Sequence, residues 1–199
     1  MYTLDENVNH YLNDVNRFKL EDISYDSSFG IAGKYKEITV EFDSKRKSET
    51  SKKIIEIARS LFKKSGLDDI DTEKGVITYT SHLYENDVYS YNYYNTPSRE
   101  NENYINAYSC YFVTQKDEEL ENGNLDLYED DDYTLSVMIG LEENKKKEFP
   151  LKTGTAFIID GDTLFNIQSC NGKGVLNIIK IVFLPNEDED ENEDEDEDE

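Results

Sequence analysis

Histidine and cysteine, the side chains most often used to hold transition metals, are scarce in this sequence. Its 199 residues include two histidines, His10 and His82, and two cysteines, Cys110 and Cys170. The histidines begin the triplets HYL and HLY, so neither starts an H-x-D or H-x-E motif. We expect no metal site of that kind in any register, and we expect His82 to be an ordinary residue at the start of a strand. Because there is no C-x-x-C motif, we expect the cysteines to be small buried hydrophobic residues in a reducing compartment.

In contrast to histidine, tyrosine is abundant in this sequence. It is frequent in the stretch DVYSYNYYNTPSRENE, residues 87–102. A tyrosine can pack its ring between strands or offer its hydroxyl group to a ligand. We expect cross-strand packing on a pleated sheet; the alternative is an aromatic-lined pocket with hydroxyl groups as hydrogen-bonding handles. The tyrosines concerned are Tyr84, Tyr89, Tyr91, Tyr93, Tyr94, Tyr104, Tyr108 and Tyr111.

Two pairs of charged residues are further candidates for binding. Asp160 and Asp162 flank Gly161 and are expected to form a turn, with a weak divalent-cation site as the alternative. Lys173 and Lys180 are expected to be solvated, with an acidic ligand held by either as the alternative. The sequence contains no glycine-rich phosphate loop, no Ser-His-Asp order and no nucleophile elbow.

Two helices are expected to support the strands that would position these residues. The first 20 residues follow a possible cap at Asp5 with apolar side chains at helical spacing, namely Val8, Tyr11, Leu12, Val15 and Phe18. A second helix is expected at about residues 49–65, ETSKKIIEIARSLFKKS, with Ser48 as its cap and Gly66 after its end. Its single apolar face predicts packing on a sheet.

From about residue 75 the sequence predicts one short strand after another. Asn122-Gly123 predicts a hairpin, and the nearly unbroken apolar run VLNIIKIVFLP predicts a strand buried on both faces. We expect a mainly β protein with flanking helices (α+β), forming a jelly roll or barrel with one or two N-terminal helices packed on the sheet. The expected strands are GVITYTSHLY (75–84), VYSYNYYN (88–95), NAYSCYFVTQ (106–115), LDLYE (125–129), YTLSVMIGL (133–141), GTAFIID (154–160), TLFNIQSC (163–170) and VLNIIKIVFLP (175–185).

The net charge of −24 bounds the possible partners. An acidic chain repels phosphate groups, so we expect no direct binding of nucleic acid. No apolar run is long enough to span a membrane, and the N-terminus is too polar for a signal peptide. We therefore expect a soluble intracellular protein of the cytoplasm or nucleus. The frequent use of Asn, Lys, Ile, Tyr and Asp is typical of an AT-rich genome, such as that of a protist or a large DNA virus; a viral protein could also reside in the virion.

The acidic residues are concentrated at the C-terminus, where residues 187–199 hold 12 of the 45 in the chain. Such a segment cannot form a core, so we expect one domain over residues 1–185 and a disordered acidic tail over 186–199. We expect the tail to act as a solubilising segment. The alternative is electrostatic capture of a basic protein by residues 187–199, which salt would weaken.

The order of several segments resembles the 2-oxoglutarate/Fe(II)-dependent dioxygenase superfamily, particularly its prolyl 4-hydroxylase-like branch. The resemblance covers about residues 29–185 and implies a double-stranded β-helix, a cupin-like jelly roll. The segments that carry it are FGIAGKYKEITVEFDSKRKSE, HLYENDVYSYNYYNTP, ELENGNLDLYE, FPLKTGTAFIIDGDTLFNI and CNGKGVLNIIKIVF.

The residues that match the iron site of that family are not the family's ligands. Aligning YYNTP with the family motif H-x-D-T-P places Tyr93 at the first histidine and Asn95 at the aspartate, while DTLFNI places Phe165 at the second histidine. The basic residue that grips 2-oxoglutarate in the family falls near Val175, with Lys173 as the nearest cation. Phenylalanine cannot coordinate a metal, and neutral tyrosine and asparagine are poor ligands for Fe(II).

We therefore expect a catalytically inactive relative with no catalytic residue, no metal and no cofactor, acting as a binding or structural module. The alternative is an active 2-oxoglutarate-dependent oxygenase, similar to prolyl or lysyl hydroxylases, that uses Fe(II) in an unorthodox site. The contributors to such a site would be Tyr93, Asn95, Asp126 and His82. A third possibility is an acidic chaperone or decoy for basic proteins that acts through its tail.

Overall fold

The computed structural model describes residues 1–21, 33–85, 93–95, 108–128, 146–160, 163, 165–168 and 170–184, with residues 33, 93–95, 146 and 166 described by their backbone alone. Four predicted features lie wholly or partly outside these residues. They are the strand at 133–141, most of the strand at 88–95, the turn at 161–162 and the acidic tail 186–199.

Both predicted helices are confirmed, together with their caps. Helix α1 (Glu6–Leu20) begins at Asp5, whose carboxylate accepts a hydrogen bond from the backbone N–H of Asn7 at 2.9 Å. Helix α2 (Glu49–Lys64) begins at Ser48, whose hydroxyl accepts from the N–H of Ser51 at 3.0 Å. The prediction for Phe18 is wrong, because its side chain is 73% exposed. Within the described residues, neither helix is long and apolar enough to cross a membrane.

The strands form a six-stranded sheet, a four-stranded sheet and a two-stranded ribbon. The larger sheet has the order β1 (Tyr2–Thr3), β9 (Thr155–Ile159), β5 (Tyr108–Lys116), β12 (Gly174–Phe183), β3 (Gly75–Tyr84) and β2 (Gly33–Phe42). The smaller sheet has the order β4 (Tyr93–Asn95), β10 (Phe165–Ile167), β7 (Asn124–Tyr128) and β8 (Lys146–Pro150). The ribbon pairs β6 (Leu120–Asn122) with β11 (Cys170–Gly172).

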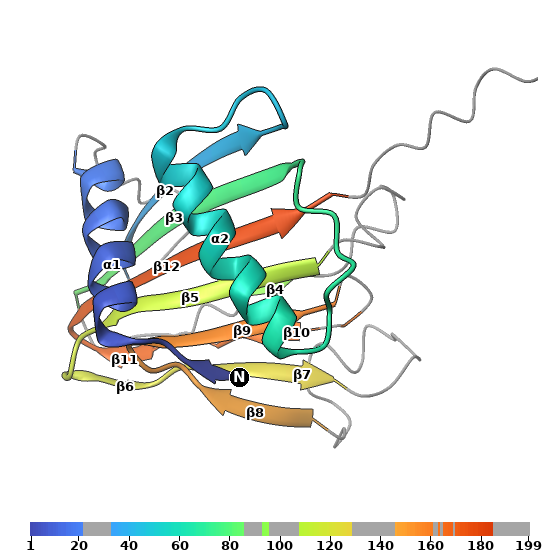
Figure 1. Ribbon diagram of the computed structural model, residues 1–199. Coiled ribbons are helices and arrows are strands. Elements are labelled where there is room, and N and C mark those ends of the chain that lie inside the picture. Colours follow the sequence, from blue (N-terminus) through green and yellow to red (C-terminus); the bar gives the residue numbers. More distant parts are fainter. Residues whose placement is uncertain are drawn as a thin grey trace, which may run out of the picture.

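The chain passes repeatedly between the two sheets, and all the pairings are antiparallel. Strand β3 of the larger sheet is followed by β4 of the smaller, then β5 of the larger, β7 and β8 of the smaller, β9 of the larger, β10 of the smaller and β12 of the larger. This order is the double-stranded β-helix, a jelly roll, with both helices lying on one face of the larger sheet (Figure 1). The predicted fold class is confirmed.

Two cores fill the layers of this structure. A helix-side core lies between the helices and the larger sheet, and an inter-sheet core lies between the two sheets. Strand β12 contributes to both, with Ile179 and Ile181 on the helix side and Leu176 and Ile178 between the sheets, which confirms its predicted burial on both faces. The buried members of the inter-sheet core are Tyr111, Val113, Leu120, Leu125, Leu151, Phe157, Ile159, Phe165, Cys170, Leu176 and Ile178.

The turn predicted at Asn122-Gly123 forms, but the predicted hairpin is wrong. Both residues have positive φ, 56° and 78°, as a tight Asn-Gly turn requires. The strands on either side of the turn do not pair with each other, because β6 pairs with β11 and β7 pairs with β8 and β10. The turn therefore redirects the chain from the ribbon into the smaller sheet. Local turn chemistry cannot reveal this, since pairing partners are chosen by tertiary packing.

Candidate functional site

Two of the three positions that the resemblance assigns to iron ligands lie next to each other. Strands β4 and β10 pair antiparallel, with Asn95 directly opposite Phe165 and Tyr93 opposite Ile167. The backbone thus brings residues 93–95 and 165–167 together on neighbouring strands of the smaller sheet.

Phe165 belongs to the inter-sheet core and is 4% exposed. Its ring meets the ring of Tyr111 edge to face, with the centroids 5.5 Å apart. A phenyl group has no lone pair for a metal, and this ring occupies the space between the sheets with apolar atoms. The side chain at this position therefore does not fit an iron ion, because two imidazoles and a carboxylate are needed to hold Fe(II) in the family's manner.

His82 lies near the end of β3, so the prediction that it starts a strand is wrong. Its ring centroid is 4.8 Å from that of Tyr35 and 6.4 Å from that of Tyr84. Burial lowers the pKa of His82 to about 4, and the imidazole is neutral at pH 7. Across the described part of the chain, no three His, Cys, Asp or Glu side chains come together as a metal site.

Asp126, one contributor to the alternative metal site, is fully buried in β7. Its neighbours Leu125 and Leu127 pack in the inter-sheet core, so alternation along the strand places Asp126 on the opposite face of the smaller sheet. There its carboxylate accepts a hydrogen bond from the side chain of Gln168 at 2.5 Å. The structure therefore does not bring Asp126 and Phe165 to the same face.

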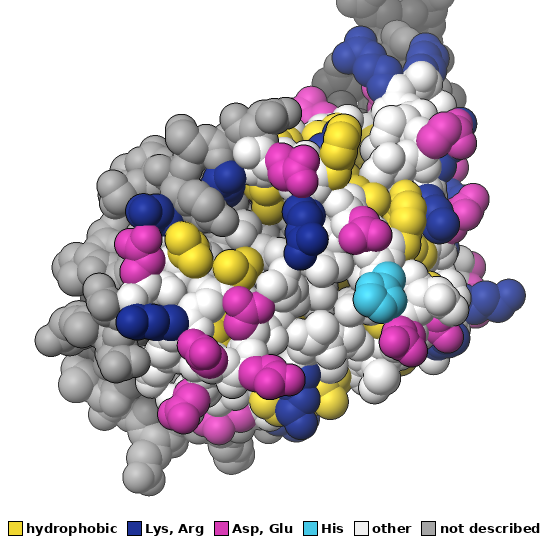
Figure 2. Space-filling model, turned by 90° about the vertical axis from the view of Figure 1, so that its left-hand side faces the viewer, with side chains coloured by type: hydrophobic (Ala, Val, Ile, Leu, Met, Phe, Trp, Pro, Cys, Tyr) yellow, Lys and Arg dark blue, Asp and Glu magenta, His cyan; other side chains and the backbone are white. Residues whose placement is uncertain are grey.

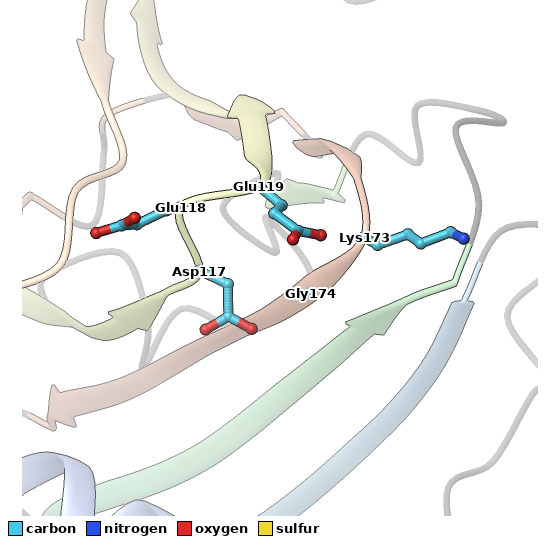
Figure 3. Close-up of a pocket in the computed structure, with 5 residues that line it drawn as sticks. All are labelled: Asp117, Glu118, Glu119, Lys173 and Gly174. Atoms are coloured by element: carbon cyan, nitrogen blue, oxygen red, sulfur yellow. The ribbon is translucent and has the colours of Figure 1, made fainter.

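Val175 and Lys173 have different surroundings. Val175 lies opposite Leu83 and donates its backbone N–H to Asp117 at 2.8 Å. Because Leu176 points between the sheets, alternation places Val175 on the other face of β12. Lys173 is exposed and lines an open groove of about 470 Å³ with Asp117, Glu118, Glu119 and Gly174. Figure 3 shows its side chain extending away from the three acidic residues.

Lys180 is a candidate that sequence reasoning placed wrongly, because it is half-buried instead of solvated. It lies in β12 opposite Thr78 on one side and Tyr111 on the other. Its ammonium group lies 5.5 Å from the centroid of the Tyr111 ring. Burial lowers the pKa of Lys180, and the carboxylate of Glu37 opposes this shift. The sequence does contain a sign of this burial. Lys180 is the one charged residue within the apolar run VLNIIKIVF, which is predicted to be buried on both faces.

The cysteines and the described tyrosines behave as packing residues, as predicted. Cys110 and Cys170 are both buried and unbridged, and burial raises the pKa of each thiol. Tyr111 is 4% exposed in the inter-sheet core, while Tyr108 packs at the edge of the helix-side core. The hydroxyl of Tyr84 accepts a hydrogen bond from the N–H of Cys170 at 3.4 Å. The other tyrosines of this group are described by their backbone alone or lie outside the described residues.

Several solved oxygenases have a similar architecture. The non-heme α-ketoglutarate-dependent epimerase SnoN of nogalamycin biosynthesis superposes with a TM-score of 0.60 at 12% identity, over 91% of this chain and 73% of its own. A prolyl-4-hydroxylase from Pseudomonas putida gives a TM-score of 0.56 at 7% identity, over 92% and 89% of the two chains. HygX from Streptomyces hygroscopicus, solved with nickel, 2-oxoglutarate and hygromycin B, gives 0.55 at 8% identity, over 93% and 81%.

Similarity at this level of identity establishes the fold and nothing finer. Comparison of the sequence with protein-family models and with curated proteins gave no match.

Proposed function

We propose that this chain, which has the fold of the 2-oxoglutarate/Fe(II) oxygenases, is a non-catalytic member of that fold and binds a ligand or partner without iron. The observation that carries the proposal is Phe165. Its ring, at the position that the sequence resemblance assigns to the second metal-binding histidine, is 4% exposed and in contact with Tyr111. A core side chain there stabilises the space between the sheets in place of a metal.

The chemistry of the neighbouring positions supports the same proposal. Asn95 lies opposite Phe165 in the register and supplies a neutral amide where the family has a carboxylate. Neither histidine starts an H-x-D or H-x-E triplet in the sequence, and the neutral ring of His82 makes tilted contacts with the rings of Tyr35 and Tyr84. Loss of outer-shell groups alone weakens metal binding about 10–100-fold, so replacing the ligands themselves should abolish specific binding.

The test is a titration of the purified full-length chain with Fe(II) under nitrogen, followed by incubation with 2-oxoglutarate in air. We expect no stoichiometric iron and no succinate above a protein-free control. One equivalent of bound iron, or succinate formed in proportion to enzyme, would instead establish the active oxygenase with an unorthodox site. Adding 2-oxoglutarate to a prolyl-4-hydroxylase in the same buffer is the positive control.

We further propose that the acidic tail, residues 187–199, engages a basic protein inside the cell. Twelve acidic residues in this segment support the proposal, because a dense block of one charge attracts the opposite charge over about 10 Å at 0.1 M salt. Full-length chain and a chain ending at Asn186 would be compared for retention of histone proteins at 50 mM and 500 mM salt. The proposal is supported if only the full-length chain retains histones, and only at 50 mM salt. Equal retention by both chains contradicts it.

A further inference from the structure

The basic residues of this acidic chain are concentrated in one segment, residues 45–64. The segment holds eight of the 21 basic residues and two of the 45 acidic ones, so it carries a net charge of +6 in a chain of net charge −24. It comprises the end of the turn after β2 and the whole of α2. The basic residues are Lys45, Arg46, Lys47, Lys52, Lys53, Arg59, Lys63 and Lys64.

The outward side of α2 presents most of this charge to solvent. The inward side packs in the helix-side core, and α2 forms an outer layer on this face of the larger sheet (Figure 1). The acidic residues of the helix are Glu49 and Glu56. Five basic residues of the helix are exposed, and we call them the basic face of α2: Lys52, Lys53, Arg59, Lys63 and Lys64.

Carboxylates of the domain compensate only part of the charge on this basic face. Two of its residues form ion pairs, Lys52 with Glu49 at 2.7 Å and Arg59 with Glu73 at 3.1 Å. Like charges four residues apart on a helix repel each other, as those of Arg59 and Lys63 do. In the part of the chain that the structure describes, three residues of the face have no carboxylate within 4.0 Å, namely Lys53, Lys63 and Lys64.

The acidic tail begins beside this helix. Phe183, the last residue of β12, packs its ring against that of Phe62 in α2, with the centroids 5.4 Å apart. The next residue, Leu184, donates its backbone N–H to the carbonyl oxygen of Lys74 at 3.1 Å. Lys74 follows the ion-pair partner of Arg59 in the sequence. The chain therefore leaves the larger sheet next to the second half of α2.

The tail has the length and the charge to cover the basic face. Residues 187–199 carry 12 acidic residues and no basic one. Thirteen residues of extended chain span about 40 Å, whereas the 16 residues of α2 span about 24 Å. A short flexible tether gives an effective concentration of about a millimolar or more, so a weak attraction suffices for docking within one chain.

We propose that the acidic tail, residues 187–199, docks on the basic face of α2 in the same chain. The same carboxylates then serve two contacts, and a basic protein must displace α2 before it can bind the tail. This inference rests on the proposed binding of a basic protein by the tail, and it supplies the regulation of that binding. The chain's own tail is the occupant, ahead of a foreign acidic segment, because its tether holds it beside the helix.

The test places a nitroxide spin label on the tail of the isotope-labelled full-length chain, through Asn192→Cys. Cys110 and Cys170 are buried, and mass spectrometry verifies that a single label is present. At 50 mM salt we expect the label to broaden the amide NMR signals of residues 45–64 more than at 500 mM, because salt screens the attraction. Broadening that is independent of salt, or that is concentrated outside residues 45–64, overturns the proposal.

A pair of matched variants tests the role of the lysines. Lys63→Gln combined with Lys64→Gln should reduce the broadening at 50 mM salt by about half or more, because it neutralises two of the three lysines without an ion pair. Lys152→Gln combined with Lys173→Gln removes two exposed lysines outside α2 and should leave the broadening unchanged. Equal reductions by both pairs would contradict docking on the basic face. Well-dispersed spectra show that each variant is folded.

A mixed sample distinguishes the chain's own tail from that of a second copy. Isotope-labelled chain without the spin label is mixed with unlabelled chain that carries it. Broadening of the signals of α2 in this mixture identifies the tail of a second copy as the occupant and overturns docking within one chain. Absence of broadening in the mixture supports it.

Retention of histones by the same proteins separates this inference from the proposed function. Localised broadening without histone retention contradicts the proposed partner and leaves the docking standing, whereas histone retention without localised broadening overturns the docking alone. If the docking regulates the tail, the variant with Lys63→Gln and Lys64→Gln should bind histones about twofold more tightly or better, since a larger fraction of its tails is free. Unchanged histone affinity in this variant contradicts the regulation.

Discussion

At the scale of single residues, Phe165 is central to the packing between the two sheets. Its ring packs among the apolar side chains between the sheets, and the ring of Tyr111 meets it edge to face. A polar side chain at this position would be surrounded by these apolar neighbours.

The first prediction concerns the cost of removing this ring. Phe165→Ala should lower the free energy of unfolding by about 3–5 kcal/mol, since it leaves a cavity in a close-packed core. Phe18→Ala is the control, because Phe18 is 73% exposed, and it should change stability by less than about 0.5 kcal/mol. Urea denaturation followed by circular dichroism measures both. Equal effects of the two substitutions would show that Phe165 is not a core residue.

The second prediction concerns the register between β4 and β10. If that register preserves the frame of an iron site, the triple substitution Tyr93→His, Asn95→Asp and Phe165→His should gain measurable Fe(II) or Ni(II) affinity. The wild type and the single substitution Phe165→His should show none. Isothermal titration with Ni(II) in nitrogen provides the measurement. A folded triple variant without affinity would mean that the frame no longer has the geometry of the site.

The third prediction follows from the lowered pKa of His82, which is about 4 in the folded protein. The unfolded chain has a histidine pKa of about 6.5, so the unfolded state binds the proton more readily. Titration of His82 therefore leaves the free energy of unfolding unchanged above about pH 6.5. As the pH falls from there towards 4, the unfolded state takes up the proton first, and the free energy of unfolding decreases by up to about 3 kcal/mol. His82→Phe removes this titration. The difference in unfolding free energy between the two proteins, measured from pH 7.5 to 4.5, should therefore change with pH; a constant difference contradicts the prediction.

At the scale of elements, the sequence predicts what depends on local periodicity and misses what depends on pairing. Helix α2 is recovered because its apolar spacing, its cap at Ser48 and Gly66 agree. Strand β3 is recovered from residues 75–84, which are rich in β-branched and aromatic side chains. The hairpin at Asn122-Gly123 is missed because a turn specifies local dihedral angles, whereas the partners of the flanking strands are set by contacts distant in sequence.

For the candidate site, too, the sequence predicts the order of the segments but not the burial of side chains or the face of the sheet on which they lie. The structure pairs Asn95 with Phe165, and the alignment of these residues with an iron site stays a prediction. The burial of Lys180 is not evident from residue type, since lysine is usually exposed. The faces on which Asp126 and Val175 lie follow from strand register, which becomes known only when the sheets are in place.

The fourth prediction compares two glycines with nearly equal backbone angles. Gly123 has φ 78° and Gly66 has φ 75°, but a Cβ atom on Gly123 would lie 2.5 Å from the Cys170 sulfur, whereas Gly66 has open space. Gly66→Ala should cost about 1 kcal/mol for the backbone alone, and Gly123→Ala should cost clearly more. Adding Cys170→Ala should recover part of the excess. Thermal unfolding of these three variants and the wild type tests this, and equal costs at both glycines would count against a steric contribution.

At the scale of the whole molecule, charge is distributed unevenly. On the face shown in Figure 2, acidic and basic side chains are interspersed, with hydrophobic side chains in small patches between them. The net charge of −24 includes 12 acidic residues in the tail, so a chain ending at Asn186 would carry −12. Removing the tail therefore halves the net charge of the chain.

The fifth prediction tests the proposed boundary between this domain and the tail. Removal of residues 187–199 should leave the melting temperature at moderate salt within about 2 °C of the full-length value, because no core residue is removed. Calorimetry of both chains at 150 mM salt gives the comparison. A fall of more than 5 °C would show that the tail contributes to the folded domain.

The position of β12 has a consequence for the synthesis of the protein. Residues 174–183 lie between β3 and β5, and they pair with residues 75–84 from much earlier in the chain. The larger sheet therefore cannot close during synthesis until residues 174–183 have emerged from the ribosome, and until then β3 and β5 lack the strand that lies between them. A premature stop anywhere before β12 would leave β3 and β5 without their common partner, and the cell would contain an aggregating fragment in place of a shortened protein.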